Sequence, residues 1–379
     1  MNERERFVAT LKCEKVDRPP FFPMFGPWDA TLERWEKEGV KKEERHKNVG
    51  LIEVSGLGEE VSNWMKSFGF DNNPHFTSYI NLGFCPKFEY EVIEDLDDCV
   101  IVRDEYGIIK KDRKDGKSMP QFLEHPVKNM GDWEKLKKER LNPDSKERFP
   151  ENWNEIAKKL KSREFPAWLG YFPYGVFGTA RDILGAEELL ISFYTQPELI
   201  HDIMNYLTDM WIRIWEKAAR KVQFDVVHLW EDMSGKQGSL ISPETFKKFM
   251  APCYEKVVDF AGRYKIPLVS VDTDGDCHEL AGIFSSLGVN LLWPLEVQAG
   301  NDVIEYRKKY PKLGIIGGID KNEIAKGKEA IESELERITP AIREGGYIPT
   351  LDHNIPPNIS WNDYTYYTFK LKEIIGKKS

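Results

Sequence analysis

The chain has 379 residues and a formal net charge of −9; 41% of its residues are hydrophobic and 31% are charged. This length fits two ordinary domains or one large barrel, and either one buries an ample core. The acidic balance argues against a nucleic-acid or anionic-membrane surface. No segment approaches the roughly 18 consecutive apolar residues of a membrane span. The N-terminus MNERERF has no apolar signal region, and five scattered cysteines form no CxxC pair, so we expect a soluble cytoplasmic protein with reduced thiols.

The first third of the chain mixes helical and strand patterns. Residues 2–12 predict a helix with Asn2 as its N-cap. Strands are expected near 21–25 and 50–55, with helices near 29–38, 58–68 and within 131–163. Residues 83–124 have alternating apolar and polar positions with the turn pairs Tyr106-Gly107 and Asp115-Gly116, which is typical of β-hairpins. We interpret 83–124 as a small β insertion beside the main fold.

From Pro166 onward, short apolar strands alternate with helices. Strands are predicted at 167–172, 225–230, 267–272, 289–295, 313–320 and 347–352. The helices between and after them are predicted at 176–193, 197–221, 244–263, 277–287, 301–310, 321–344 and 360–375. This alternation indicates parallel βα units, and the tally approaches eight. The sequence therefore predicts a single (β/α)8 TIM barrel over 1–379. An open doubly wound sheet is the alternative, although the chain lacks GxGxxG and GxxxxGKS motifs.

Three carboxylates follow the buried strand at 267–272. Asp272, Asp274 and Asp276 stand at alternate positions with Gly275 among them. Like charges at the end of a buried strand repel one another and resist desolvation, so a metal, a cation or helix N-terminal amides must compensate them. One of the three can simply cap the helix that starts near Cys277, but capping needs only one carboxylate.

The other predicted strands also end in polar residues. They are His228, Glu231 and Asp232; Cys277 and His278 after the three aspartates; Glu296; Asp320 with Lys321; and Asp352 with His353. Carboxylate and imidazole groups from separate strands are the ligands of a catalytic zinc or other divalent site. The alternative for single residues is structural: Asp320 caps a helix and pairs with Lys321, and His228 is a satisfied core histidine. The aromatic run at 168–177 serves either as core or as an apolar wall for a flat ligand.

Several segments resemble the uroporphyrinogen decarboxylase superfamily along nearly the whole chain. They are NERERFVATLKCEKVDRPPFFP, FPYGVFGTARDILGAEELL, SVDTDGDCHEL, LGVNLLWPLEVQAG, GGIDKNEIAKGKEAIESEL and GGYIPTLDHNIPP. The resemblance implies a (β/α)8 barrel and one of two chemistries. One is cofactor-free decarboxylation of uroporphyrinogen acetate arms, and the other is methyl transfer between a corrinoid protein and a thiol or methyl donor, usually assisted by zinc.

Two departures from the family patterns narrow this choice. The decarboxylases share an Arg-rich motif, RQAGR, for substrate carboxylates, whereas PMFGPWDATLERW here has no arginine fork. The methyltransferases carry a His-x-Cys zinc motif and a later Cys, which correspond here to Asp272, Asp274 and His353. Hard oxygen and imidazole ligands suit polarisation of an oxygen or nitrogen better than activation of a thiol. The resemblance therefore favours demethylation of an O-methyl or N-methyl compound.

The sequence thus predicts a corrinoid-dependent methyltransferase. Its expected metal ligands are Glu231, Asp272, Asp274 and His353, its catalytic residues Glu231, Asp274 and His353, and its substrate-binding residues His228, Tyr171, Tyr174, Phe177 and Trp230. The expected cofactors are zinc or another divalent metal and a cobamide carried by a separate corrinoid protein. A small methyl donor is the other partner, and a homodimer is left open. The alternatives are a uroporphyrinogen decarboxylase-like enzyme and a non-catalytic binding protein on the same barrel.

Overall fold

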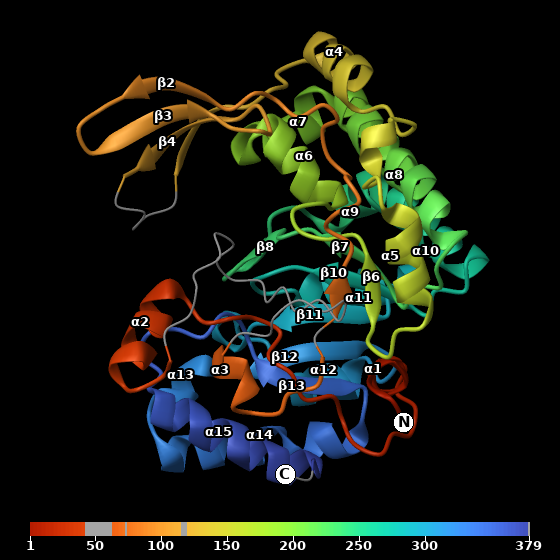
Figure 1. Cartoon of the computed structure of the whole chain (residues 1–379). Helices are drawn as coiled ribbons and strands as arrows, with labels where there is room; N and C mark the ends of the chain where they lie inside the picture. The colour runs from red at the N-terminus through yellow and green to blue at the C-terminus, as the bar shows by residue number, and fades with distance from the viewer. Residues whose placement is uncertain (42–62, 73, 115–119, 378–379) are drawn as a thin grey trace.

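A curled sheet of seven parallel strands forms the centre of the computed structural model, which describes residues 1–41, 63–72, 74–114 and 120–377 (Figure 1). In spatial order its strands are β1 (His75–Phe76), β6 (Ala167–Leu169), β7 (Val226–Trp230), β10 (Leu268–Asp272), β11 (Leu291–Leu295), β12 (Gly314–Ile319) and β13 (Tyr347–Leu351). Each strand after β6 follows its neighbour through a helical crossover, as in other parallel α/β sheets.

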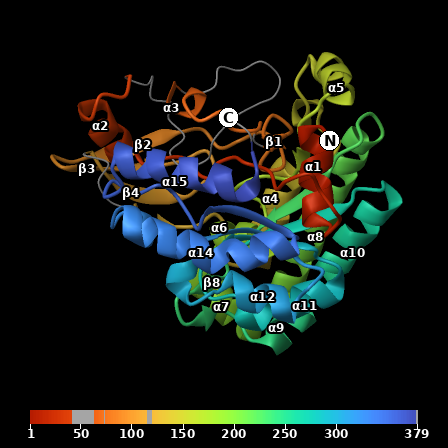
Figure 2. The same ribbon diagram turned by 90° about the horizontal axis from the view of Figure 1, so that it is seen from below.

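The two faces of this sheet bury separate apolar cores. On the concave face, Trp168, Val226, Leu268, Leu291 and Ile316 pack together, with one or two residues from every strand. The convex face packs against the helices, where α14 and α15 lie side by side (Figure 2). Because successive strand residues point to opposite faces, short strands of nearly continuous apolar residues supply both cores.

Helix α1 (Glu3–Leu11) closes the end of the concave core from which the strands start. The Asn2 side chain accepts a hydrogen bond from the Glu5 N–H, and the Glu5 carboxylate accepts one from the Asn2 N–H, which is a complete capping box. Phe7 and Leu11 of the same helix belong to the concave core. Both the expected helix and its expected N-cap are therefore present.

The predicted eight-stranded closure is observed only in part. Residues 21–25 do not form a strand; only Phe25 is at a single bridge position, and a further isolated bridge joins Pro27 to Ile355. Pro20 and Pro23 lack N–H donors, so a regular ladder cannot form here. Phe22 and Met24 nevertheless join the concave core, and the Met24 N–H contacts Thr350 Oγ1 at 3.3 Å. The strand predicted near 50–55 lies outside the described residues, and β1 at 75–76 is an addition.

The helices cover the outside of the sheet, with α6, α8 and α10 on one flank and α14 and α15 on the opposite one (Figure 1). Before strands β6 to β13 lie α2 (Asp29–Lys37), α3 (Asn63–Lys66), α4 (Met130–Arg140), the 3₁₀ turn η1 (Lys146–Arg148) and α5 (Trp153–Lys161). Between and after them lie α6 (Val176–Leu184), α7 (Ala186–Thr195), α8 (Pro197–Ala219), α9 (Pro243–Phe249), α10 (Ala251–Arg263), α11 (His278–Leu287), η2 (Val297–Ala299), α12 (Val303–Lys309), α13 (Lys321–Ile324), α14 (Lys328–Glu344) and α15 (Trp361–Ile375).

Three predicted helices are divided in two. The breaks fall at Gly185, at Met250 before Pro252, and at 325–327, because glycine and proline interrupt helical hydrogen bonding. None of the helices in the described part of the chain combines the length and the apolar character that a membrane span requires.

A four-stranded antiparallel sheet forms within residues 83–124. Its strands are β2 (Glu91–Asp95), β3 (Cys99–Arg103), β4 (Ile109–Arg113) and β5 (Gln121–Glu124), in that order. The sheet projects from the body on the same side as α2 (Figure 1). A separate hairpin, β8 (Ser234–Gly235) with β9 (Gly238–Ser239), follows strand β7. No strand of 83–124 pairs with the parallel sheet among the described residues.

A buried ion pair fastens the start of the sheet to the N-terminal segment. Asp225 accepts hydrogen bonds from the Arg163 guanidinium at 2.6 Å, the Ala167 N–H at 2.9 Å and Arg4 Nε at 2.7 Å. The Arg163 and Asp225 side chains are 1% and 3% exposed. Removal of Asp225 would leave the charge of Arg163 buried without compensation.

We expect Asp225→Ala to lower the free energy of unfolding by about 3–5 kcal/mol, the usual cost of breaking a buried pair from one side. Urea denaturation measures this loss. Arg213→Ala, which removes an exposed partner of Asp144, is the matched control and should cost less than about 1 kcal/mol. Similar losses in both variants would contradict an anchoring role for Asp225.

Candidate active site

The C-terminal ends of the parallel strands form one edge of the sheet, which we call the rim. Inward-facing residues alternate along each strand, and Trp168, His228 and Trp293 pack against one another below the rim. This aromatic layer fills the interior of the curled sheet. The next inward positions, Trp230 and Asp272, are paired in register and therefore lie above the layer. Side chains at the rim are thus the ones that a ligand can reach.

An acid–histidine cluster lies at the rim, made of Asp274, Glu296 and His353. One potential ligand atom from each residue lies within 4.8 Å of the others. His353 Nε2 is 3.6 Å from Asp274 Oδ2, and the imidazole stacks on the Phe25 ring with centroids 4.6 Å apart. All three residues are only partly buried. The cluster therefore offers two carboxylates and an imidazole to one point in space.

Gly275, between Asp274 and Asp276, permits the backbone turn of the loop that carries Asp274. Gly275 has a φ of +77°, and a Cβ there would lie 2.5 Å from the Ser234 carbonyl oxygen. Only glycine tolerates both conditions. The Gly275 N–H donates to Glu296 Oε2 at 2.9 Å, which orients that carboxylate and leaves its other oxygen for a ligand.

Burial and mutual repulsion shift the pKa values of this cluster. Burial raises the pKa of Glu296, and the Asp274 carboxylate raises it further. Burial lowers the pKa of His353, but the neighbouring Asp274 and Glu296 outweigh it, so the net pKa lies above the ordinary value. A divalent cation would relieve the repulsion between carboxylates that produces these shifts.

Asp272 lies beside the cluster and is more deeply buried, with 6% of its surface exposed. Among the residues that the structure describes, none donates a hydrogen bond to its carboxylate. Burial raises its pKa well above the ordinary range, and the charges of Asp274, Asp232 and Glu296 raise it further. Asp272 thus lies close enough to the cluster to interact with it electrostatically, but it is not one of the three converging groups, and its role as a metal ligand stays a prediction.

Glu231 lies at the N-terminus of helix α6 rather than in the cluster. Its Oε1 accepts from the Val176 N–H at 3.0 Å and the Tyr254 hydroxyl at 2.6 Å. Its Oε2 accepts from the Phe177 N–H at 2.6 Å and the Gly178 N–H at 3.2 Å. Burial raises its pKa to about 7, while these four donors act in the opposite direction. Both oxygens are thus engaged in holding the helix.

The predicted substrate-binding residues fall into two groups. His228 is buried in the aromatic layer with Nδ1 3.3 Å from Ser270 Oγ, and burial lowers its pKa to about 3. Trp230, in contrast, is partly exposed at the rim. Its ring lies 4.6 Å from the half-exposed Phe172 ring, and the Arg181 guanidinium lies 5.0 Å from it.

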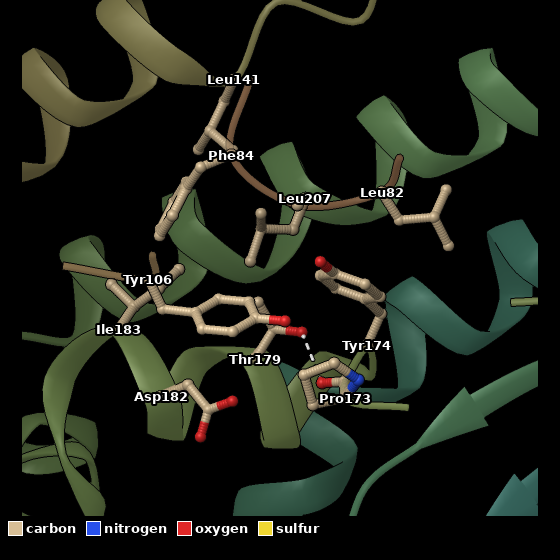
Figure 3. Close-up of a pocket in the computed structure, with 11 residues that line it drawn as sticks. Leu82, Phe84, Tyr106, Leu141, Pro173, Tyr174, Thr179, Asp182, Ile183 and Leu207 are labelled. Atoms are coloured by element: carbon tan, nitrogen blue, oxygen red, sulfur yellow. Dashed lines mark hydrogen bonds between the residues drawn. The ribbon is translucent and has the colours of Figure 1, made fainter. Parts of the chain in front are cut away.

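The remaining predicted residues lie on the convex side of the sheet. Phe177 is buried in the convex core, and the Tyr171 hydroxyl donates to the Ile80 carbonyl at 2.9 Å. Tyr174 faces a small, mostly apolar pocket of about 20 Å³ together with Tyr106 of the insertion and Asp182 of α6 (Figure 3). Burial raises the pKa of Asp182 to about 6. This pocket is separated from the rim by α6.

The other strand-end residues have structural partners. Asp276 accepts from the His278 N–H at 3.0 Å, and the Cys277 thiol is buried against Asn301 and Tyr306. Asp320 caps α13, with its carboxylate accepting from the Asn322 N–H at 2.8 Å. Lys321 pairs with Asp352 at 3.2 Å instead of with Asp320.

Glu296 is the residue that the predicted ligand set omits. It follows strand β11 directly, as Glu231 follows β7 and Asp352 follows β13, so its position after the strand indicates that it lies at the rim. Sequence order alone does not distinguish its carboxylate from that of Glu231, since both come one residue after a strand. The two carboxylates are distinguished by the hydrogen bonds that other elements donate to them: α6 and Tyr254 to Glu231, and Gly275 to Glu296.

The parallel sheet and its rim cluster are features of α/β enzymes that act at the carboxyl ends of their strands. The family model of uroporphyrinogen decarboxylase (URO-D) matches residues 60–368, and the chain belongs to this family. A methyltransferase from Methanosarcina mazei has a similar fold, with a TM-score of 0.56 and 14% identity over 98% of each chain. At this identity the likeness concerns the fold. A comparison with curated protein sequences gave no match.

We expect Glu231→Gln to lower the free energy of unfolding by about 1–3 kcal/mol at pH 8, because an amide nitrogen would face backbone N–H donors. Urea denaturation measures the loss, with Glu187→Gln on the exposed start of α7 as the control. Zinc affinity should stay within about twofold of the wild type. A large loss of affinity with unchanged stability would instead assign Glu231 to the metal.

Proposed function

We propose that this protein is a methyltransferase that moves a methyl group from a small O-methyl or N-methyl donor to a separate corrinoid protein. Membership in an enzyme superfamily and a fold shared with a methyltransferase support this function. The observation that carries it is the acid–histidine cluster at the rim, because it offers a set of metal ligands in place of a set of cations for substrate carboxylates.

The donors of the cluster fit a zinc or other divalent ion. Bonds of 2.0–2.2 Å in a tetrahedral site put ligand atoms about 3.4 Å apart. The 3.6 Å separation of His353 Nε2 and Asp274 Oδ2 is close to this value, and Glu296 supplies the third ligand. Asp272 lies outside this group of three, so a water molecule or the substrate would take the fourth position. When bound, the metal would polarise the oxygen or nitrogen that leaves the methyl group.

The residues of the chain orient the donor and limit access of water. Phe25 fixes the ring of His353 by stacking, and the Gly275 N–H fixes the carboxylate of Glu296. Trp230 forms part of the opposite wall of the rim. Because the ligand atoms are partly exposed, a second protein can present its corrinoid to the same rim.

Decarboxylation of a porphyrinogen fits this rim poorly. A substrate with several carboxylates needs several unpaired cations. Arg181 already binds Asp232 at 2.9 Å, and Lys321 already binds Asp352. The carboxylates of Asp272, Asp274 and Glu296 would repel such a substrate further.

Asp274→Asn should lower zinc affinity at least tenfold, because it removes a charged ligand, while the protein stays folded. Calorimetric titration of zinc measures the affinity, and thermal melting without metal tests the fold. Asp276→Asn, which changes a nearby aspartate outside the cluster, is the control. Equal zinc affinities for wild type and Asp274→Asn would contradict the metal site.

Zinc affinity should also fall as the pH is lowered, because His353 must be neutral to bind a metal. The pKa of His353 in the metal-free protein is raised above its ordinary value of 6.5. Protons therefore compete with zinc for this imidazole already at pH values above 6.5. In Asp274→Asn the main group that raises this pKa is gone, so the onset of the loss should move to lower pH. An affinity that is independent of pH between 5 and 8, in the wild type, would exclude His353 as a ligand.

A direct assay follows methyl transfer to a reduced corrinoid protein by its change in visible absorption. Wild-type enzyme should convert the spectrum in the presence of a suitable methyl donor, and His353→Ala should not. Release of carbon dioxide from a carboxylic acid substrate without spectral change would support decarboxylation instead.

A further inference from the structure

An aromatic pair, Phe172 and Trp230, forms the rim wall next to Asp272. Phe172 is 50% exposed although its ring packs on Trp230 with centroids 4.6 Å apart at 75°. The Trp230 ring also packs over Gly178, where an added Cβ would lie 2.8 Å from it. This contact and Arg181 fix the indole in place, so the pair offers a rigid apolar surface.

The carboxylate beside this wall has no partner of its own. Asp272 is paired in register with Trp230, is 6% exposed, and receives no hydrogen bond from any described residue. Burying a carboxylate without a hydrogen bond or an opposite charge is costly. The nearby acidic residues increase this cost, so a group that binds here gains most if it carries a positive charge.

Arg181 and Lys321, two cations that the described residues bring to the rim, do not meet this need. Arg181 is held by the backbone carbonyl and the carboxylate of Asp232, at 2.7 and 2.9 Å. Lys321 is held by Asp352. A divalent metal on the acid–histidine cluster would neutralise part of the charge, but a metal ion makes no favourable contact with an apolar wall. A neutral methyl ether could use the wall but would gain nothing from the negative charge of the neighbouring carboxylates.

One class of ligand satisfies both the wall and the carboxylate. Alkylated ammonium ions have an apolar surface and a delocalised positive charge, and proteins bind them with aromatic rings and carboxylates. We propose that the methyl donor is a methylated ammonium compound whose cationic head lies between the aromatic pair and Asp272. This inference rests on the proposed methyl-transfer function and narrows it to N-methyl donors.

The chemistry of such a donor balances without an added proton. The carbon–nitrogen bond would break with its electron pair on nitrogen, and a quaternary ammonium would leave as a neutral tertiary amine. A quaternary nitrogen has no lone pair, so a metal on the acid–histidine cluster would not act on the leaving atom of this donor. The methyl carbon receives an electron pair from the reduced cobalt of the partner's corrinoid, which is thereby oxidised by two electrons. Loss of the positive charge on the donor weakens its attraction to Asp272, which favours release of the product.

The test compares choline with 3,3-dimethyl-1-butanol, its neutral carbon analogue, by calorimetric titration of the whole protein with and without zinc. Choline should bind at least tenfold more tightly than the neutral analogue. Asp272→Asn should reduce choline affinity at least tenfold, and Phe172→Ala should reduce it about 2- to 30-fold, the range of cation–π interactions. Phe369→Ala, which removes an equally exposed ring on α15, should leave it unchanged. Thermal melting checks that each variant is folded.

Equal affinity for the two compounds, or no saturable choline binding, would overturn the inference. So would choline binding that Phe172→Ala and Asp272→Asn leave unchanged, since the site would then lie elsewhere. The proposed function fails separately: choline can bind as expected while no methyl compound alters the corrinoid spectrum. Conversely, transfer from a methoxy compound without choline binding would keep the function and reject the ammonium donor.

Discussion

The aromatic layer inside the curled sheet is the constraint on which the rest of the site depends. Trp168, His228 and Trp293 fill the concave face. Because His228 is buried among these rings, its pKa is lowered and its imidazole is neutral. Because side chains alternate along a strand, a filled layer leaves only the next inward positions near solvent. Those positions hold Trp230 and Asp272, so the packing of the interior decides which residues reach a ligand.

Above that layer the rim concentrates negative charge beyond what its own cations neutralise. Arg181 and Lys321 are each committed to one carboxylate, and Asp272 receives no hydrogen bond in the described part of the chain. Functional sites often retain such unfavourable electrostatics because a ligand relieves them. A metal at Asp274, Glu296 and His353 and a cation at Asp272 would relieve different parts of the same charge.

Helix α6 contacts both the carboxylate of Glu231 and the ring of Trp230 in the aromatic wall. Glu231 holds the start of the helix through three backbone N–H groups, and the helix carries Gly178 and Arg181, which pack on Trp230. Glu231, which the sequence predicts as a metal ligand, therefore positions the helix that packs on Trp230. The hard ligands of the cluster differ from the thiolates that the family resemblance implies, which accords with a substrate that is not a thiol.

The sequence by itself determined the local structure and the general place of the site. Asn2 capped its helix as expected, the apolar strands after Pro166 joined one parallel sheet, and polar residues at their ends gathered on one rim. These features follow from periodicity and capping, which act over a few residues. The strand expected at 21–25 failed because prolines there lack the donors for a ladder, although its apolar side chains still entered the core.

Only the tertiary structure decided how the acidic residues divide their roles. Glu231 and Glu296 both come directly after a strand, yet one meets the N–H groups of α6 and the other meets Asp274 and His353. Tyr171, Tyr174 and Phe177 have the composition of a binding wall but face the convex core. Their surroundings come from segments tens to hundreds of residues away, so no local pattern specifies whether a side chain is satisfied by the protein or left for a ligand.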